Sequence, residues 1–350
     1  MPGYLDLGAT ASYFLLELFL PLLIFVVSAY FLWRIQSRIA LFSYYKLVLP
    51  QLRRNNLFYR LLGSAAVASH EILGHALVGV ATGSDAEMAA DLTPESGKVR
   101  IAHKVSAWGY LSAILATLAP CFAPPALILL AAIFLFPSTL AFIATDVPSL
   151  ASEILSNFLS IASIAFNSDL TNPFATLFTL LLAVLSSTAG ASRADFAIIR
   201  SQTRKYWYFA LFLLLAASAG LEILRAFFSL PSALGLFFPA ISFLFLAFLT
   251  VMLGVAISLA FAAYLKSLYG FSTLLKLASA VAFPAAYFAI LYTTLSFPLP
   301  YYLSALLLSL LALAIWTALL RLAFSPVRGK EAPSRGRRMR MRSLRDYEEG

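Results

Sequence analysis

The sequence predicts an all-α polytopic membrane protein with about nine transmembrane helices and one polar loop at residues 83–104. The chain has 350 residues, of which 61% are hydrophobic and only 12% are charged. Its mean hydropathy is +0.87, which excludes a soluble domain of this size. Apolar runs long enough to cross a hydrocarbon core of about 30 Å recur from end to end. Because these runs do not alternate with polar residues, they also argue against a membrane β-barrel.

The predicted spans divide the chain into four parts. Residues 1–56 carry the first transmembrane helix and an aromatic segment at 39–50, expected to lie in the membrane interface as a separate helix. Residues 57–205 form a metallopeptidase-like transmembrane core, 206–325 form the C-terminal transmembrane helices, and 326–350 form a basic disordered tail. The nine apolar runs are 12–33, 57–82, 106–136, 149–166, 172–190, 206–228, 236–264, 277–297 and 301–323.

Basic residues orient these predicted spans. If all nine runs cross, the basic clusters at 34–54, 193–205, 266–276 and 335–345 fall on one side, which the positive-inside rule makes cytoplasmic. The N-terminus and loop 83–104 are then outside, and the C-terminal tail is cytoplasmic. The net charge of +9 is explained by this orientation signal, so we expect the lipid bilayer and no nucleic acid as a partner.

Prolines and a single cysteine limit the chemistry of the core. Pro120, Pro124 and Pro125 interrupt the third run, so its backbone carbonyls must find partners in neighbouring helices or a cavity. Cys121 is the only cysteine, which excludes an internal disulfide framework and a zinc site built from thiolates.

A cluster of ionisable residues lies inside the second apolar run. Residues 69–76 read Ser-His-Glu-Ile-Leu-Gly-His-Ala, and they hold His70 and His75, two of the three histidines in the chain. Ionisable side chains are costly inside a membrane and are functional by default. A structural polar cluster or a proton relay remains the alternative to a metal site.

The spacing of the histidines predicts a distorted helix. His70 and His75 are at i and i+5, so a regular helix would place them about 140° apart. A bulge of π type would bring them to one side, and Gly74 would ease that distortion. On a regular helix, Glu71 and His75 would instead share a face and leave His70 outside the site.

Two families resemble this motif. His-Glu-Ile-Leu-Gly-His is similar to the zinc motif of the dipeptidyl peptidase III family. In that motif, as here, one residue more separates the histidines than in the common His-Glu-x-x-His motif. The wider segment, roughly 57–200, resembles the site-2 protease family of intramembrane zinc metalloproteases, on Gly74-His75-Ala76, the polar loop and the proline-interrupted helix. The resemblance implies His70 and His75 as zinc ligands, Glu71 as general base, and a later aspartate as third ligand.

Asp195 is the best match for that third ligand, and Glu222 is the next candidate. Asp195 also fits a helix-capping pattern after Ser192, and Glu222 could pair with Arg225. The expected function is an intramembrane Zn²⁺-dependent peptidase that cleaves membrane-embedded or membrane-proximal peptides by metal-activated water. The alternatives are a proton- or metal-coupled membrane transporter that uses the His/Glu cluster, and an inactive relative that binds partner helices.

Overall fold

The computed structural model describes residues 19–267, except 55, 84, 89–91, 96, 98, 103–106, 138, 145, 167–171 and 229–232. The chain divides into two compact units, residues 1–259 and 260–350. Of the second unit, the described part is the end of one helix, residues 260–267. Predicted spans 277–297 and 301–323 and the basic tail lie outside the described residues. The predicted orientation, with the N-terminus outside and the tail cytoplasmic, therefore stays a prediction.

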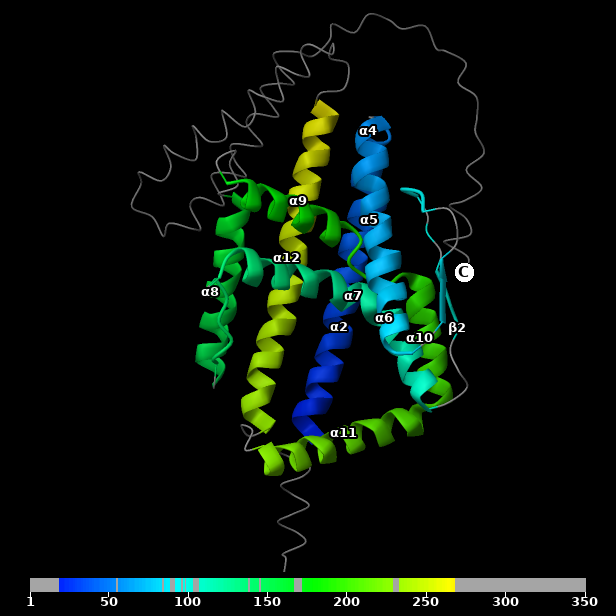
Figure 1. Ribbon diagram of the computed structural model, residues 1–350, viewed down its shortest axis with the longest axis vertical. Helices are drawn as coiled ribbons and strands as arrows, with labels where there is room; N and C mark the ends of the chain where they lie inside the picture. The colour runs from blue at the N-terminus through cyan, green and yellow to red at the C-terminus, as the bar shows by residue number, and fades with distance from the viewer. Residues whose placement is uncertain are drawn as a thin grey trace, which may run out of the picture. The chain divides into compact units, whose positions relative to one another are not determined.

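Most of the described chain is helical, as Figure 1 shows. Three short π-helical segments, labelled η, interrupt the first two long helices. The elements are α2 (Leu20–Phe42), η2 (Ser43–Val48), α3 (Leu49–Leu52), α4 (Asn56–Phe58), η3 (Tyr59–Gly63), α5 (Ser64–Ala68), η4 (Ser69–Ala76), α6 (Leu77–Ala81), β1 (Asp85–Met88), β2 (Val99–Ala102), α7 (Ala107–Leu135), α8 (Val147–Phe166), α9 (Pro173–Ser187), α10 (Arg193–Lys205), α11 (Trp207–Phe228) and α12 (Ala233–Ser267).

Five helices in the described part of the chain are long and apolar enough to cross a membrane. The protein is therefore a helical membrane protein, as its composition predicts. These helices are Leu20–Leu52, Asn56–Ala81, Trp108–Leu135, Val147–Phe166 and Phe237–Lys266. One of the predicted spans is shorter here, because α9 has 15 residues, whereas α11 has 22.

The predicted separate helix at 39–50 is not observed. Residues Leu20–Leu52 form one continuous helix of 33 residues, in which the π-helical η2 joins α2 to α3. Pro50 does not end this helix, and it directly follows the π-helical segment η2.

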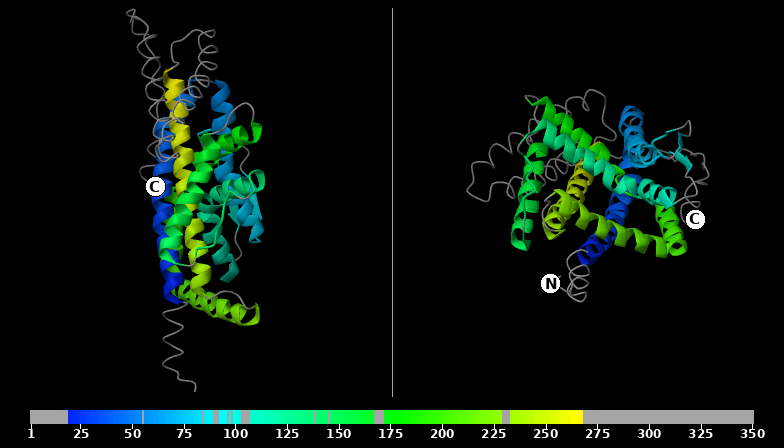
Figure 2. Two further views of the ribbon diagram at one scale, coloured as in Figure 1. Left: turned by 90° about the vertical axis from the view of Figure 1, so that its left-hand side faces the viewer. Right: turned by 60° about the horizontal axis from the view of Figure 1, so that its bottom comes forward.

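The helices α10 and α11, Arg193–Lys205 and Trp207–Phe228, follow one another in the chain and meet where the predicted sixth span begins. Figures 1 and 2 show α11 lying crosswise to α2 rather than alongside it. Tyr206, directly after α10, stacks edge-on against Tyr110 near the start of α7, with ring centroids 5.2 Å apart. The end of the 193–205 segment thus lies against the start of α7, and the prediction that it lies on the opposite side of the membrane from loop 83–104 stays a prediction. The hydrophobicity of a helix does not reveal whether it runs alongside its neighbouring helices or crosswise to them.

The hydrophobic core of the first unit lies where α7, α8, α9 and α12 meet. Its fully buried side chains include Ile128, Ile161, Phe178 and Leu246. Gly254 lets α12 approach α9 closely, since a Cβ there would lie 2.4 Å from the carbonyl oxygen of Leu182.

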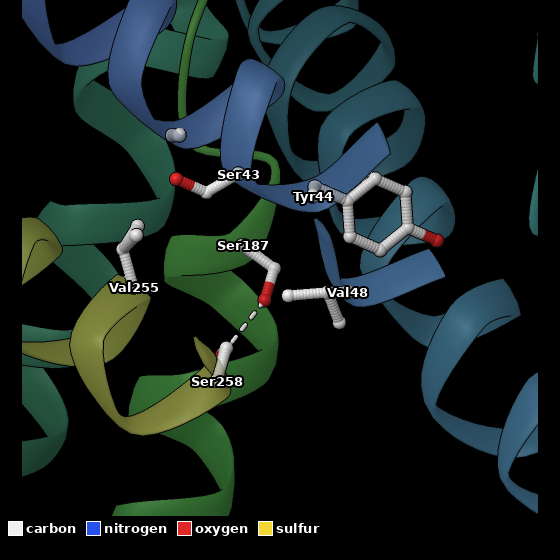
Figure 3. Close-up of a pocket in the computed structure, with 7 residues that line it drawn as sticks. Ser43, Tyr44, Val48, Ser187, Val255 and Ser258 are labelled. Atoms are coloured by element: carbon white, nitrogen blue, oxygen red, sulfur yellow. Dashed lines mark hydrogen bonds between the residues drawn. The ribbon is translucent and has the colours of Figure 1, made fainter. Parts of the chain in front are cut away.

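Beside this core, small side chains line a tight pocket between η2, α9 and α12, shown in Figure 3. Ser187 and Ser258 are hydrogen-bonded there at 2.9 Å. The hydroxyl of Tyr44 donates to the backbone carbonyls of Gly63 and Pro94 at 3.0 and 2.9 Å. Because its lining is apolar or hydroxylic, this pocket offers no acid or base for catalysis.

The polar segment 83–104 folds back along the second long helix. Its strands β1 and β2 pair antiparallel, from Asp85 opposite Ala102 to Met88 opposite Val99. The turn residue Glu95 is held by the Tyr59 hydroxyl and by an ion pair with Arg53, each at 2.7 Å. This contact matters for the site, because it holds the start of β2 next to η4.

Candidate metal centre

The segment η4 brings both motif histidines to one side of the helix. It is a π-helix over Ser69–Ala76, which adds residues to each turn and so compensates for the i to i+5 spacing. The rings of His70 and His75 meet edge to face with their centroids 5.0 Å apart. The predicted distortion of the helix is therefore confirmed, and the regular-helix alternative is wrong.

Gly74 serves this arrangement by allowing a close approach to α7. A Cβ on Gly74 would lie 2.8 Å from Cγ and 3.1 Å from Cα of Pro120. A side chain at position 74 would thus clash with Pro120. This packing constraint adds to the backbone freedom of glycine, which the sequence analysis expected to ease the helix distortion. The contact holds η4 directly against the proline-interrupted stretch of α7.

Pro120 also creates the hydrogen-bond partner of His75. A proline has no N–H to offer the carbonyl four residues before it, which here is that of Ala116. His75 supplies the missing donor, because its Nδ1 lies 2.8 Å from this oxygen. The sequence prediction that the carbonyls freed in this run find partners elsewhere is confirmed at this position.

His70 is oriented in the same way by a different freed carbonyl. Its Nδ1 lies 3.0 Å from the backbone oxygen of Thr188, the residue at the C-terminal cap of α9. The last carbonyls of a helix have no partner within it. Since a carbonyl only accepts, both histidines donate from Nδ1–H, and each presents Nε2 as a potential ligand atom.

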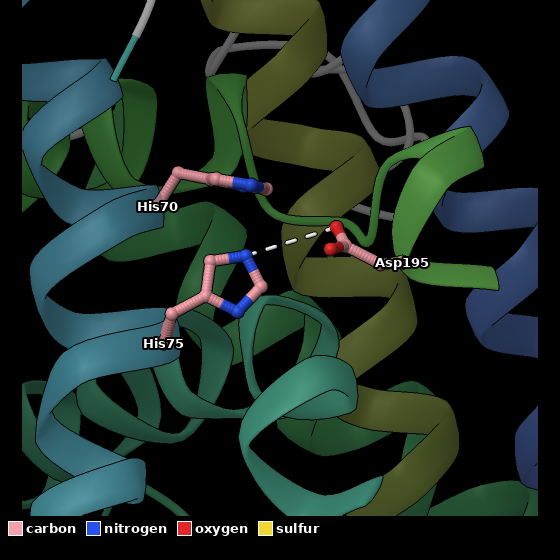
Figure 4. A group of neighbouring side chains, drawn as sticks. All are labelled: His70, His75 and Asp195. Atoms are coloured by element: carbon pink, nitrogen blue, oxygen red, sulfur yellow. Dashed lines mark ion pairs between the residues drawn. The ribbon is translucent and has the colours of Figure 1, made fainter. Parts of the chain in front are cut away.

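Asp195 approaches these ligand atoms from α10. Its Oδ2 lies 3.7 Å from Nε2 of His75, and both side chains are mostly buried, at 15% and 12% exposure. Figure 4 shows His70, His75 and Asp195 converging, and one ligand atom of each lies within 4.8 Å of the others. The structure thus brings together all three residues expected to bind the metal.

The helix-capping role of Asp195 is present as well. Its backbone N–H donates to the Ser192 hydroxyl at 3.1 Å, and its Oδ2 accepts from the Ser192 backbone N–H at 2.6 Å. This capping box fixes the carboxylate at the start of α10. The cap and the proximity to the histidines are not alternatives, because the carboxylate of Asp195 makes both contacts.

The donor set has the chemistry of a metal site. With Nδ1–H engaged, the Nε2 lone pair of a neutral His75 faces a carboxylate oxygen, and two such groups repel unless a cation or proton lies between them. Two neutral imidazoles and one carboxylate are a ligand set that zinc accepts, with one position left for substrate or water. The three residues could therefore hold a metal ion, and they fit zinc.

Glu71 lies next to this cluster without belonging to it. It interacts electrostatically with His75 and Asp195 and takes a backbone hydrogen bond from Val99 at the start of β2. Gly97 packs against it so closely that a Cβ there would lie 2.5 Å from Cγ of Glu71. The carboxylate of Glu71 is thus positioned by two residues of the folded-back polar segment, Gly97 and Val99.

Of the remaining candidate residues, Cys121 alone has a described side chain, and it is not part of the cluster. Glu222 lies in α11, but its side chain is outside the described residues, as is His103. Cys121 is fully buried, and its Sγ accepts from the backbone N–H of Ala191 at 3.2 Å.

The residues that orient the site were not identified from the sequence. They are the carbonyls of Ala116 and Thr188, and the amide of Gln36, which donates to the carbonyl of Ala189 beside Thr188, was not identified either. A signal was available for two of them, because Ala116 lies four residues before Pro120 and Gln36 is a polar residue in an apolar run. Their partners belong to other helices, so only the tertiary structure reveals them.

Comparison of the chain with protein-family models, with curated proteins and with solved structures finds no match in any of the three. The function is therefore argued from the site itself.

Proposed function

We propose that this protein is an intramembrane zinc-dependent peptidase, in which His70, His75 and Asp195 hold the metal and Glu71 is the general base. The observation that carries the proposal is the convergence of these three side chains, with one ligand atom of each within 4.8 Å of the others. The orienting hydrogen bonds on both Nδ1 atoms support it, since metal-binding histidines almost always donate their second nitrogen in this way.

The depth of the cluster favours a substrate in or near the membrane. Arg60 precedes His70 by ten residues and Thr82 follows His75 by seven, so the motif is separated from the polar positions at both ends of its helix by about two turns or more. The cluster thus lies well inside the helix Asn56–Ala81. A soluble substrate would not reach it easily, so we propose a transmembrane or membrane-proximal peptide as the substrate.

The residues divide the chemistry between them. A zinc ion held here would supply Lewis acidity toward water and the peptide carbonyl. Glu71 would accept the proton of the attacking water and pass it to the nitrogen of the leaving amine. The carbonyls of Thr188 and Ala116 keep both imidazoles in the Nδ1–H form, and the capping box keeps Asp195 oriented.

A second function is favoured by one specific observation. The contact of 3.7 Å between His75 and Asp195 would also be satisfied by a protonated imidazole. The same residues would then form a proton relay or the ion site of a metal- or proton-coupled transporter. Metal retention separates the two functions, because a peptidase holds its zinc tightly while a transporter releases its cargo.

The direct test is the metal content of purified protein. We expect about one zinc per chain, as three protein ligands provide for a catalytic site, and we expect His75→Ala to lose it. The control is His103→Ala, which alters the remaining histidine of the chain. Elemental analysis after dialysis measures both variants. Zinc that is absent from the wild type, or unaffected by His75→Ala, would reject the proposal.

Restoring a helix donor at position 120 should weaken metal binding. In Pro120→Ala the new N–H can bond the Ala116 carbonyl and compete with Nδ1 of His75. We expect zinc affinity to fall about 10- to 100-fold, the usual effect of losing an orienting partner, as measured by competition with a chromogenic chelator. Pro124→Ala is the matched control, because the carbonyl that it pairs does not contact the histidines. Equal affinity in both variants would contradict this account.

A further inference from the structure

Gln36 is a buried amide in the middle of an apolar helix. It lies on α2 and is only 1% exposed, next to Ser37 at 3%. A polar side chain inside a membrane helix is costly unless its hydrogen bonds are made. Gln36 makes two of them, and both go to backbone carbonyls on other parts of the fold.

The two bonds of Gln36 join α2 to α7 and to the connector 188–192. Its Nε2 donates to the carbonyl of Cys121 at 2.9 Å and to that of Ala189 at 3.0 Å. The carbonyl of Cys121 is available because Pro125, four residues later, has no N–H. The carbonyl of Ala189 is available because it follows the end of α9. One amide thus satisfies two freed backbone groups.

The connector 188–192 is held closely around these bonds. Gly190 packs on α2 so tightly that a Cβ there would lie 2.4 Å from Cα of Ser37. The next residue, Ala191, donates its N–H to Sγ of Cys121 at 3.2 Å. The connector then ends at Ser192, the cap of α10, whose N–H is bonded to the carboxylate of Asp195.

We infer that Gln36 is a positioning residue that fixes the carboxylate of Asp195 opposite His70 and His75. It acts through the connector, since the cap of α10 follows Ala189 by three residues and moves with it. The same connector begins with Thr188, whose carbonyl orients His70, so Gln36 supports the ligands from both sides of the site. As far as it concerns metal binding, this inference rests on the proposed metal centre.

The test removes the amide while keeping the length of the side chain. Gln36→Met leaves the carbonyls of Cys121 and Ala189 without their donor. Gln51→Met is the matched control, because it makes the same change on the same continuous helix, about 22 Å away at 1.5 Å per residue. Gln36→Asn is a milder variant that keeps an amide too short to reach both carbonyls, in case Gln36→Met does not fold.

Two measurements on the full chain in detergent read out the effect. Hydrogen–deuterium exchange of peptides covering 188–196 should become at least about tenfold faster in the Gln36 variants, because the hydrogen bonds that hold the connector are lost. Zinc affinity should fall about 10- to 100-fold, and the visible absorption of the Co²⁺-loaded protein should shift as its coordination changes. Gln51→Met should alter none of these.

Each outcome decides between the claims. Unchanged exchange in the Gln36 variants would overturn the inference whether or not the protein binds metal. Faster exchange with unchanged zinc affinity and an unchanged Co²⁺ spectrum would also overturn it, because the connector would then not set the ligand. If the wild-type protein binds no zinc but the Gln36 variants still exchange faster, the metal centre is rejected and the action of Gln36 on the connector stands.

Discussion

Glu71→Gln is expected to retain zinc while peptide cleavage falls by roughly 10²- to 10⁴-fold, the range that general-base catalysis contributes. The substitution keeps the shape of the side chain and leaves both imidazoles in place. Glu71 lies beside the cluster of His70, His75 and Asp195 rather than within it, so its loss removes a proton acceptor and no ligand. Zinc stoichiometry and cleavage of a transmembrane peptide, measured on one preparation, test this directly.

The matched control for this variant is Glu95→Gln. Glu95 belongs to the same folded-back segment that touches Glu71, but it pairs with Arg53 at an exposed position. We expect it to keep most of its cleavage activity, since an exposed ion pair contributes little. Full cleavage by Glu71→Gln would reject the proposed mechanism. Loss of zinc from that variant would instead make Glu71 a ligand.

Asp195→Ala is expected to abolish tight zinc binding. The carboxylate is the one charged donor in the cluster, and its removal leaves two imidazoles, one fewer than the three protein ligands of a catalytic zinc site. The zinc content after dialysis should fall from about one per chain to near zero. Elemental analysis and chelator competition measure this change, and cleavage activity should disappear with the metal.

The two roles of Asp195 can be separated by a second variant. Ser192→Ala removes the hydroxyl that caps α10 and should lower the free energy of unfolding by about 0.5–2 kcal/mol. It leaves the carboxylate of Asp195 and its bond from the Ser192 N–H in place, so zinc should remain bound. If Asp195→Ala keeps its zinc, the third ligand must be another residue, and Glu222 becomes the first candidate.

The class of protein follows from composition alone. Apolar residues in runs of about 20 can be satisfied only in a bilayer, and the five long apolar helices agree with this. The distortion of the motif is equally local, because two histidines spaced five residues apart on one helix share a side only if a π-helical turn lies between them. These features depend on residues near each other in the sequence, where spacing determines geometry.

The directions of the helices relative to one another were decided by tertiary contacts. The segment α11 lies crosswise to α2 (Figures 1 and 2), and residues 39–50 extend the first helix. Both segments are as apolar as a crossing helix. Their direction depends on the elements that they pack against, and a hydropathy profile carries no information about packing partners.

The assembly of the site was decided in the same way. His70 bonds a carbonyl 118 residues away, and Gln36 bonds one 153 residues away. The motif identified His70 and His75, and its resemblance to site-2 proteases proposed Asp195 as their partner. Only the tertiary structure determined which freed carbonyls orient the histidines, since these are backbone groups that every residue carries and only packing selects among them.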